Sequence, residues 1–404
     1  MLGHFSLLSL AMWSLFLLAI RIAIVPPESC GDTSLEAIDG AAHQAITWIR
    51  RNQRPDGTYL YIYNSESDSI PDEYNEVRHA GVTMALYQAA GRYGDREFLA
   101  AGDRGLDWMV DRLVHERGWA ALAPDNQRAK LGASALMAAA LIERRLATGE
   151  TQYDDLMRGL GRFLLTLQRD DGGFSTAWLV NSDAPEYGTS SRYYPGEASW
   201  ALALMASAFP GEDWQSAAIR GLRFLATERD QLENVDFPPL ADQWAAYTLA
   251  ALPATALRDQ EIDYARRLAA RFGLLVRVEA QRQDSWLGRA VRGRESRAAG
   301  AGTWLEGLGA LWSLSASVQP LADIRPKIEE RLTCVAGIMA ARQVNELEAM
   351  SYPRPDLAQG AWFRAGETRM DDQQHAFSGL LYAADALRSG TDGERTSALA
   401  VGEQ

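Results

Sequence analysis

The sequence contains little of what metal-binding and nucleic-acid-binding proteins use most. Its 404 residues include only two cysteines and five histidines, which excludes a cysteine-rich zinc site. Its formal net charge is −13, and no run of lysine or arginine offsets it. Binding to phosphates needs a basic face, so a nucleic-acid partner is excluded as well. Phosphate-binding glycine loops and nucleophile elbows are also missing, and we expect neither a metal nor a cofactor.

The two cysteines, Cys30 and Cys334, allow a single pairing. They can form a disulfide if the protein works in an oxidising compartment. Cys30 lies close to an apolar N-terminus, where it can equally remain a free thiol. The sequence leaves both alternatives open.

The N-terminus is the longest apolar run of the chain. Residues 5–25 are interrupted only by Arg21, and their length suits a membrane helix of about 20 residues. No basic residue precedes the run and no small-residue cleavage site follows it, which favours an uncleaved anchor over a signal peptide. The flank after the run is acidic, so nothing retains it in the cytoplasm. We predict that residues 1–27 are a membrane anchor or uncleaved signal. The rest of the chain is then periplasmic or outside the cell, and secreted if the N-terminus is cleaved.

Apolar residues recur at helical spacing from residue 35 to residue 387, in segments of two alternating kinds. One kind is amphipathic and charged, in residues 35–53, 96–113, 153–168, 213–230, 260–272 and 324–343. The other is rich in alanine, glycine and leucine, in residues 78–94, 130–149, 194–211, 241–257, 302–317 and 371–388. A helix that is apolar on nearly all sides is buried, whereas a one-sided helix lies outside. Strand patterns are scarce.

This alternation predicts an all-α fold, an (α/α)6 barrel or toroid of six inner and six outer helices, over residues 28–390. A disordered tail, 391–404, follows it. Four outer-to-inner connections are long, namely 53–77, 169–195, 273–301 and 344–371, whereas the inner-to-outer turns are short. The long loops therefore share one rim and form a one-ended funnel, and loops of this length are usually functional.

Two of the long loops open with a related phrase, NQRPDGTY (52–59) and LQRDDGGF (167–174). Its local function is to end a helix at Gly57 or Gly172 with an aspartate turn. The phrase resembles one found in α/α-toroid proteins, which include six-hairpin glycosidases and terpenoid cyclases. The resemblance in architecture covers residues 35–387 and implies the same toroid.

The members of that group differ in the residues they need. The D-x-D-D stretch of protonating terpenoid cyclases is absent, because Arg369 and Met370 precede the aspartate pair. The zinc ligands of lanthionine-type cyclases are also absent. His375 matches a histidine on the last inner helix of N-acylglucosamine-type 2-epimerases, but the stretch ADQW (241–244) replaces their second histidine. Unsaturated-glucuronyl hydrolases and related glycosidases use acidic residues at the funnel, and this sequence has such residues.

Polar and aromatic residues recur where the inner helices begin. In a toroid these helix ends all face the funnel, where their dipoles add positive potential. We predict catalytic roles for His79, Glu197, Asp242, Asp372 and His375, and substrate binding by Arg78, Tyr193, Tyr194, Gln243, Trp304, Glu306, Trp362 and Gln374.

The chemistry of this set is that of acid–base catalysis. Glycosidic cleavage needs a protonated acid and a carboxylate, and Glu197 and Asp242 come from consecutive inner helices. The last helix meets the first in a closed ring, so His79 and His375 can approach each other, and a histidine–carboxylate pair suits proton transfer near neutral pH.

We therefore expect a carbohydrate-active protein of the cell envelope that hydrolyses a glycosidic bond in a polysaccharide or oligosaccharide, possibly one that contains uronic acids. A polysaccharide lyase or a sugar epimerase on the same fold is the first alternative, with Arg78 holding a uronic carboxylate. The other is a non-catalytic module that binds a glycan or an envelope protein, because toroids host many functions.

Overall fold

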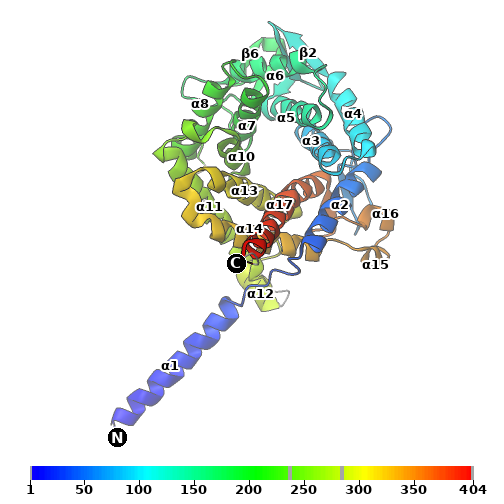
Figure 1. Cartoon of the computed structure of the whole chain (residues 1–404). Coiled ribbons are helices and arrows are strands. Elements are labelled where there is room, and N and C mark those ends of the chain that lie inside the picture. The colour runs from blue at the N-terminus through cyan, green and yellow to red at the C-terminus, as the bar shows by residue number, and fades with distance from the viewer. Residues whose placement is uncertain (1, 235–238, 283–285, 402–404) are drawn as a thin grey trace.

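The chain folds into a closed ring of helices, described here from a computed structural model that covers residues 2–234, 239–282 and 286–401. The inner helices are α3 (Glu76–Tyr93), α5 (Leu131–Thr148), α7 (Tyr194–Ala208), α10 (Gln243–Ala251), α13 (Ala298–Ser317) and α17 (Met370–Val401). Each packs against the next, and α17 packs against α3, which closes the ring (Figure 1).

The outer layer alternates with the inner one along the chain. It consists of α2 (Leu35–Arg51), α4 (Arg96–Val110), α6 (Asp154–Leu167), α8 (Trp214–Thr227), α11 (Asp259–Ala280) and α14 (Arg325–Arg342). The alternation follows from the sequence, because inner helices such as α5 are buried almost throughout, whereas α2 and α6 bury one face. The predicted six-and-six arrangement is confirmed.

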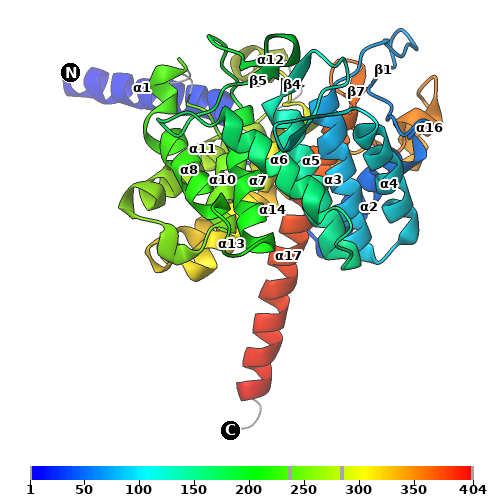
Figure 2. The ribbon, with the colours of Figure 1, turned by 90° about the horizontal axis from the view of Figure 1, so that it is seen from above.

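Short strands lie within the loops between outer and inner helices, gathered at one end of the ring (Figure 2). Antiparallel pairs join β1 (Ile62–Asn64) to β7 (Glu367–Arg369), β2 (Leu113–Glu116) to β3 (Trp119–Leu122), β4 (Arg128–Lys130) to β5 (Ala177–Leu179), and β5 to β6 (Ala184–Pro185). The same end contains α9 (Arg229–Leu232), α12 (Trp286–Arg292), α15 (Glu346–Ala349) and α16 (Pro355–Ala358). Three 3-10 turns are formed by Val180–Ser182, Ala254–Ala256 and Gln319–Ile324.

Two of the loops between outer and inner helices differ from the prediction. The connection from α4 to α5 is also long and contains a hairpin, and α11 extends to Ala280, well into the predicted loop 273–301. Residues 235–238 and 283–285 lie outside the described residues. Part of the predicted loop 273–301 therefore also lies outside the described residues.

The repeated phrase after the outer helices is a structural joint. The side-chain amide of Gln53 donates to the carbonyl of Ala101 at 2.9 Å, and that of Gln168 donates to the carbonyl of Ala217 at 3.0 Å. Gly57 and Gly172 have φ of +85° and +89°, and a Cβ there would come within 2.2 and 2.5 Å of a carbonyl oxygen of the next outer helix. The phrase thus fastens each outer helix to the next and does not itself enter the funnel.

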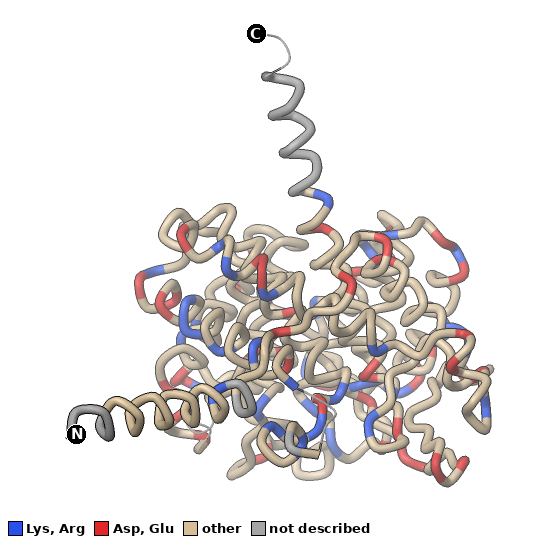
Figure 3. The backbone as a smooth tube through the Cα atoms, turned by 90° about the horizontal axis from the view of Figure 1, so that it is seen from below, with Lys and Arg blue, Asp and Glu red and all other residues tan. Residues whose placement is uncertain are grey.

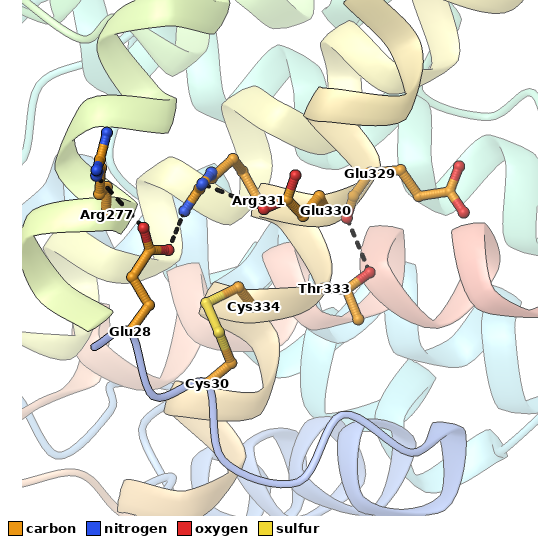
Figure 4. Close-up of a disulfide and its surroundings, with 8 residues drawn as sticks. All are labelled: Glu28, Cys30, Arg277, Glu329, Glu330, Arg331, Thr333 and Cys334. Carbon is orange, nitrogen blue, oxygen red and sulfur yellow. Dashed lines mark hydrogen bonds and ion pairs between the residues drawn. A yellow bond between two sulfur atoms is a disulfide. The ribbon is translucent and has the colours of Figure 1, made fainter. Parts of the chain in front are cut away.

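A disulfide between Cys30 and Cys334 fastens the segment before α2 to α14, which settles the pairing that the sequence leaves open (Figure 4). Glycines allow the backbones to touch: a Cβ on Gly337 would lie 2.2 Å from the carbonyl oxygen of Cys30. Glu28 adds ion pairs to Arg277 and Arg331.

Helix α1 (Leu2–Ile24) projects away from the ring, and most of its described part is uncharged (Figures 1 and 3). In the portion of the chain that the structure describes, no helix combines the length and apolarity needed to cross a membrane. This finding does not support the predicted anchor at residues 1–27. The backbone of α17 is helical to Val401, and residues 402–404 lie outside the described residues, so the disordered tail stays a prediction.

Candidate functional site

A cavity of about 330 Å³ opens where the inner helices begin, as expected for a funnel at that end. Its volume lies at the low end of the range for ligand sites, roughly 300–1,000 Å³. The lining comprises Asn75, Val77, Arg78, Gly81, Leu136, Tyr193, Tyr194, Glu197, Gln243, Trp244, Ala299, Gly300, Thr303, Asp371, Gln374 and His375. Five of the six inner helices contribute polar or aromatic side chains or the residue that caps them. The cavity therefore unites residues that are 300 positions apart in the sequence.

Glu197 is the most unusual of the lining residues. It lies in the first turn of α7 and is 4% exposed, and its Oε2 atom is buried without a hydrogen-bond partner among the described residues. Gly132 of α5 makes this possible, since a Cβ there would lie 2.1 Å from that oxygen. Burial raises the pKa of Glu197 to about 8, with Asp242 adding to the rise and His375 opposing it. The carboxyl group is therefore mostly protonated at neutral pH.

His375 faces the same cavity from the first turns of α17. Its Nδ1 atom is 2.9 Å from Oε2 of Glu306, a fully buried residue of α13. Burial lowers the pKa of His375, but the hydrogen-bonded carboxylate of Glu306, together with the charge of Asp371, outweighs burial and raises the pKa above its ordinary value. Nδ1 is thus occupied by Glu306, which leaves Nε2 to meet a ligand.

Arg78 and Asp371 form an ion pair on the cavity wall, with Nε and Oδ2 3.1 Å apart. Arg78 also contacts the Tyr61 hydroxyl and ring. The Oδ1 atom of Asp371 is buried and has no hydrogen-bond partner in the described part of the chain. An arginine next to a carboxylate with a spare oxygen can bind sugar hydroxyls as well as a sugar carboxylate.

Aromatic rings enclose one side of the cavity. The ring of Trp244 lies edge-on to that of His375, with centroids 6.1 Å apart, and Tyr193 and Tyr194 line the cavity from the start of α7. Flat rings of this kind pack against the apolar faces of sugars.

Seven of the thirteen predicted site residues therefore line the cavity: Arg78, Tyr193, Tyr194, Glu197, Gln243, Gln374 and His375. Glu306 lies behind His375 instead of in the cavity. Trp304 packs partly buried against the core, and the indole N–H of the buried Trp362 donates to the carbonyl of Met339 at 2.8 Å. These placements do not support direct ligand contact by Glu306, Trp304 or Trp362.

Three of the residues predicted to be catalytic are bonded to other groups of the protein and do not line the cavity. Asp242 caps α10 and forms an ion pair with Arg229 in which both side chains are fully buried. Asp372 binds Arg297 at 2.9 Å and accepts hydrogen bonds from the backbone N–H groups of Ala299 and Arg369. Both carboxylates hold neighbouring segments together, and neither lines the cavity.

His79 is likewise a packing residue. Its Nδ1 lies 2.6 Å from the Tyr74 hydroxyl and its Nε2 lies 2.8 Å from the carbonyl oxygen of Gly105, while its ring lies 4.3 Å from that of Trp108. Burial lowers the pKa of His79 to about 4. The predicted approach of His79 to His375 therefore does not produce a shared site.

Asp371, Trp244 and Thr303 also line the cavity, although they are not among the predicted site residues. The signal for Asp371 was present, because it directly precedes Asp372 at the start of the last helix. Choosing between the two would have required knowing which side of the helix faces inward. In the described residues no group of three or more histidine, cysteine, aspartate or glutamate side chains is arranged to hold a metal ion.

No protein-family model matches the chain, and no curated protein sequence matches it. Solved structures do match. The chain has the fold of the six-hairpin glycosidase-like enzymes. A D-mannose isomerase is similar at 11% identity with a TM-score of 0.60, over 88% of this chain and 98% of that one. An unsaturated glucuronyl hydrolase specific for heparin is similar at 10% identity and a TM-score of 0.60, over 88% and 99%.

The α-1,6-mannanase of a Salegentibacter species is a third such structure, at 12% identity and a TM-score of 0.57, over 88% of this chain and all of that one. These likenesses confirm the predicted resemblance to six-hairpin glycosidases at the level of the fold. Isomerases and hydrolases both occur among the similar structures, so the reaction must be argued from the site.

Proposed function

We propose that the cavity is the active site of a carbohydrate-active enzyme that hydrolyses a glycosidic bond. The observation that carries this proposal is Glu197, a buried glutamic acid that faces the cavity and stays protonated near neutral pH. A carboxylic acid in this state is what protonation of a glycosidic oxygen requires. The similar structures with this fold, which act on carbohydrates, favour the same class of substrate.

The second carboxylate of the proposed reaction is Asp371. Its pairing with Arg78 leaves Oδ1 free to activate a water molecule or to attack the sugar. Glu197 would give its proton to the leaving oxygen as the glycosidic bond breaks, and the water or Asp371 would form the new bond to the sugar carbon. Arg78 would hold the substrate, and it suits a sugar carboxylate such as that of a uronic acid.

The test uses a panel of manno-oligosaccharides, gluco-oligosaccharides and uronic-acid oligosaccharides with purified full-length protein. We expect Glu197→Gln and Asp371→Asn to lower hydrolysis by roughly 10²- to 10⁴-fold, the usual contribution of an acid–base group, while binding measured by calorimetry persists. The control is Glu330→Gln, because Glu330 is exposed on the outer helix α14 and does not line the cavity. Full activity of Glu197→Gln on a substrate that the wild type cleaves would refute the proposal.

A second candidate function is isomerisation or epimerisation of a free sugar, and the observation that favours it is His375. A histidine held at Nδ1 by a buried glutamate can move a proton at a sugar carbon through Nε2. Incubation of free hexoses in D₂O separates the candidates, because an isomerase builds deuterium into the sugar next to the carbonyl carbon, whereas a glycosidase does not.

The cellular location forms part of the proposal. The Cys30–Cys334 disulfide supports an oxidising compartment, such as the periplasm or the cell exterior. Labelling of free thiols in cells before and after reduction would test this, since a disulfide protects both cysteines until it is reduced.

A further inference from the structure

Three oxygen atoms of residues that line the candidate site are buried and have no hydrogen-bond partner among the described residues. They are Oε2 of Glu197, Oδ1 of Asp371 and Oε1 of Gln243. Six buried side-chain oxygens in the described part of the chain lack a partner, so half of them belong to this one cavity. Glu197 and Asp371 act in the proposed reaction, whereas Gln243 has no function in it. An acceptor buried without a donor destabilises a fold, so the Gln243 amide needs an explanation.

Gln243 is the first residue of α10, between two residues with structural functions. The preceding Asp242 caps the helix and pairs with Arg229, and the indole ring of Trp244 lies 5.3 Å from that of Trp200. Helix capping and core packing at this corner are therefore supplied by the two neighbours. The Gln243 side chain, which is only 2% exposed, lines the cavity instead.

Close contact between α7 and α10, which are adjacent in the ring, places Gln243 near the proposed acid, Glu197 (Figure 1). Gly196 immediately precedes Glu197, and a Cβ on Gly196 would lie 2.7 Å from Cβ of Trp244 and 3.1 Å from Oδ1 of Asp242. The residues that follow Gly196 and Asp242 are Glu197 and Gln243, and both line the cavity. The two helix starts therefore form one part of the cavity wall.

The next inner helix, α13, leaves room in the cavity. It begins with small residues, of which Ala299, Gly300 and Thr303 line the cavity. A Cβ on Gly300 would meet no atom within 4 Å, so the space beside Gly300 is open. With a volume of about 330 Å³, the cavity suits a compact ligand such as one sugar unit.

The unpaired atoms specify which kind of chemical group can lie beside Gln243. An amide oxygen only accepts hydrogen bonds, and so does the carboxylate of Asp371 in its ion pair with Arg78. A carboxylate or sulfate group has no proton to donate and is disfavoured beside such acceptors. A hydroxyl group donates one hydrogen bond and can accept another at the same time. The group that satisfies Gln243 is therefore a free hydroxyl.

We propose that Gln243 is a specificity-determining residue of the candidate site, whose amide oxygen accepts a hydrogen bond from one free hydroxyl group of the sugar unit in the cavity. The inference rests on the proposed function in one respect, namely that the ligand is a carbohydrate. Sugars in which this hydroxyl is removed, methylated or sulfated bind weakly, because Gln243 then stays buried without a donor. The site thus selects carbohydrates that are unmodified at this position.

The test compares sugars that differ in one hydrogen-bond donor. Methyl glycosides of mannose, glucose and glucuronic acid are titrated into the full-length protein, and binding is followed by ligand-observed nuclear magnetic resonance. The tightest binder is then compared with its monofluoro analogues, each of which has fluorine in place of one hydroxyl group. Fluorine is similar in size to a hydroxyl group but cannot donate. We expect at least one analogue to bind about 10- to 100-fold more weakly than its parent, as an unpaired buried acceptor requires.

Gln243→Met identifies the acceptor. Methionine has nearly the length and volume of glutamine but does not replace its amide oxygen. We expect the variant to bind the parent glycoside about 10-fold more weakly. It should lose the discrimination against one analogue and keep the discrimination against the others, as in a double-mutant cycle. A purely structural function of Gln243 would instead weaken the binding of all these sugars by the same factor.

The matched control is Gln343→Met. Gln343 is also a buried glutamine, but its amide donates to the carbonyls of Ala41 and Gly360, both at 3.0 Å, and it does not line the cavity. We expect this variant to keep the wild-type ratios between the parent and each analogue.

The proposal is overturned if Gln243→Met keeps the wild-type ratios, or if none of the three glycosides binds to the wild type. Selectivity that depends on Gln243 in a protein without hydrolytic activity would overturn the proposed reaction alone. Hydrolysis by a protein without this selectivity would overturn the present inference alone.

Discussion

The first turns of α3 and α17 are neighbours in the ring and each contains a histidine, yet the two side chains are held in opposite ways. Both nitrogens of His79 are bonded to groups of the protein, and its ring is packed against Trp108. His375 is bonded on one side only and faces the cavity on the other. A histidine at an inner helix start is thus a functional candidate only if one nitrogen stays uncommitted.

Two acids at the starts of α7 and α10 repeat this contrast. Asp242 is paired with Arg229, whereas the equally buried Glu197 has a carboxyl oxygen with no partner in the described residues. The two differ in what a substitution should do. Loss of a committed side chain should damage the fold, and loss of an uncommitted one should damage function.

The largest effect on stability is expected for Asp242→Asn. This change leaves Arg229 as a buried charge without its partner, which costs on the order of 3–5 kcal/mol of unfolding free energy. Glu197→Gln replaces a neutral carboxyl group by a neutral amide of the same shape and should cost less than about 1 kcal/mol. Urea denaturation at pH 7 measures both. Equal losses in the two variants would remove the distinction drawn between them.

A smaller effect is expected for His79→Gln. Removing one or both hydrogen bonds of a buried side chain costs about 1–3 kcal/mol. His375→Gln should cost less, because glutamine can still donate to Glu306 and the other side of the residue faces the cavity. Thermal unfolding of the two variants tests the order. A less stable His375→Gln would mean that His375, too, is mainly a packing residue.

The last effect is absent at neutral pH and develops only as the pH falls. The pKa of His79 falls to about 4 on folding, from about 6.5 in the unfolded chain. The unfolded state therefore binds more protons between pH 6.5 and 4, and His79 lowers stability over that interval by at most about 1.4 kcal/mol per pH unit.

His375 has the opposite sign. Its pKa is raised on folding, so its contribution to stability is present below pH 6.5 and is lost as the pH rises through the folded pKa. Unfolding free energies from pH 4 to 8 for the wild type, His79→Gln and His375→Gln isolate each contribution as a difference. A His79→Gln curve parallel to that of the wild type below pH 6.5 would contradict the assignment.

The ring itself could be predicted from the sequence because the evidence for it is local. Whether a helix is apolar on one side or on all sides can be counted along the chain, and the strict alternation of the two kinds left one architecture. The helix that precedes the ring was harder to interpret, since its apolar composition does not say what surrounds it.

The site could be predicted only in part, because, of two neighbouring residues at a helix start, one lines the cavity and the other does not. Arg78 lines the cavity and His79 does not, Gln243 does and Asp242 does not, and Asp371 does and Asp372 does not. One residue along a helix is a rotation of about 100°. The sequence gives the position of each helix start but not its rotation toward the axis of the ring, which the packing of all twelve helices decides together.

The disulfide between Cys30 and Cys334 closes most of the chain into one covalent loop. It spans 304 positions and joins the segment before the first outer helix to the last outer helix, so nearly the whole ring lies inside one covalent loop. A protease that cuts any one of the long funnel loops between these cysteines opens the chain but releases no fragment. The disulfide keeps the two pieces covalently linked, and they can separate only when it is reduced.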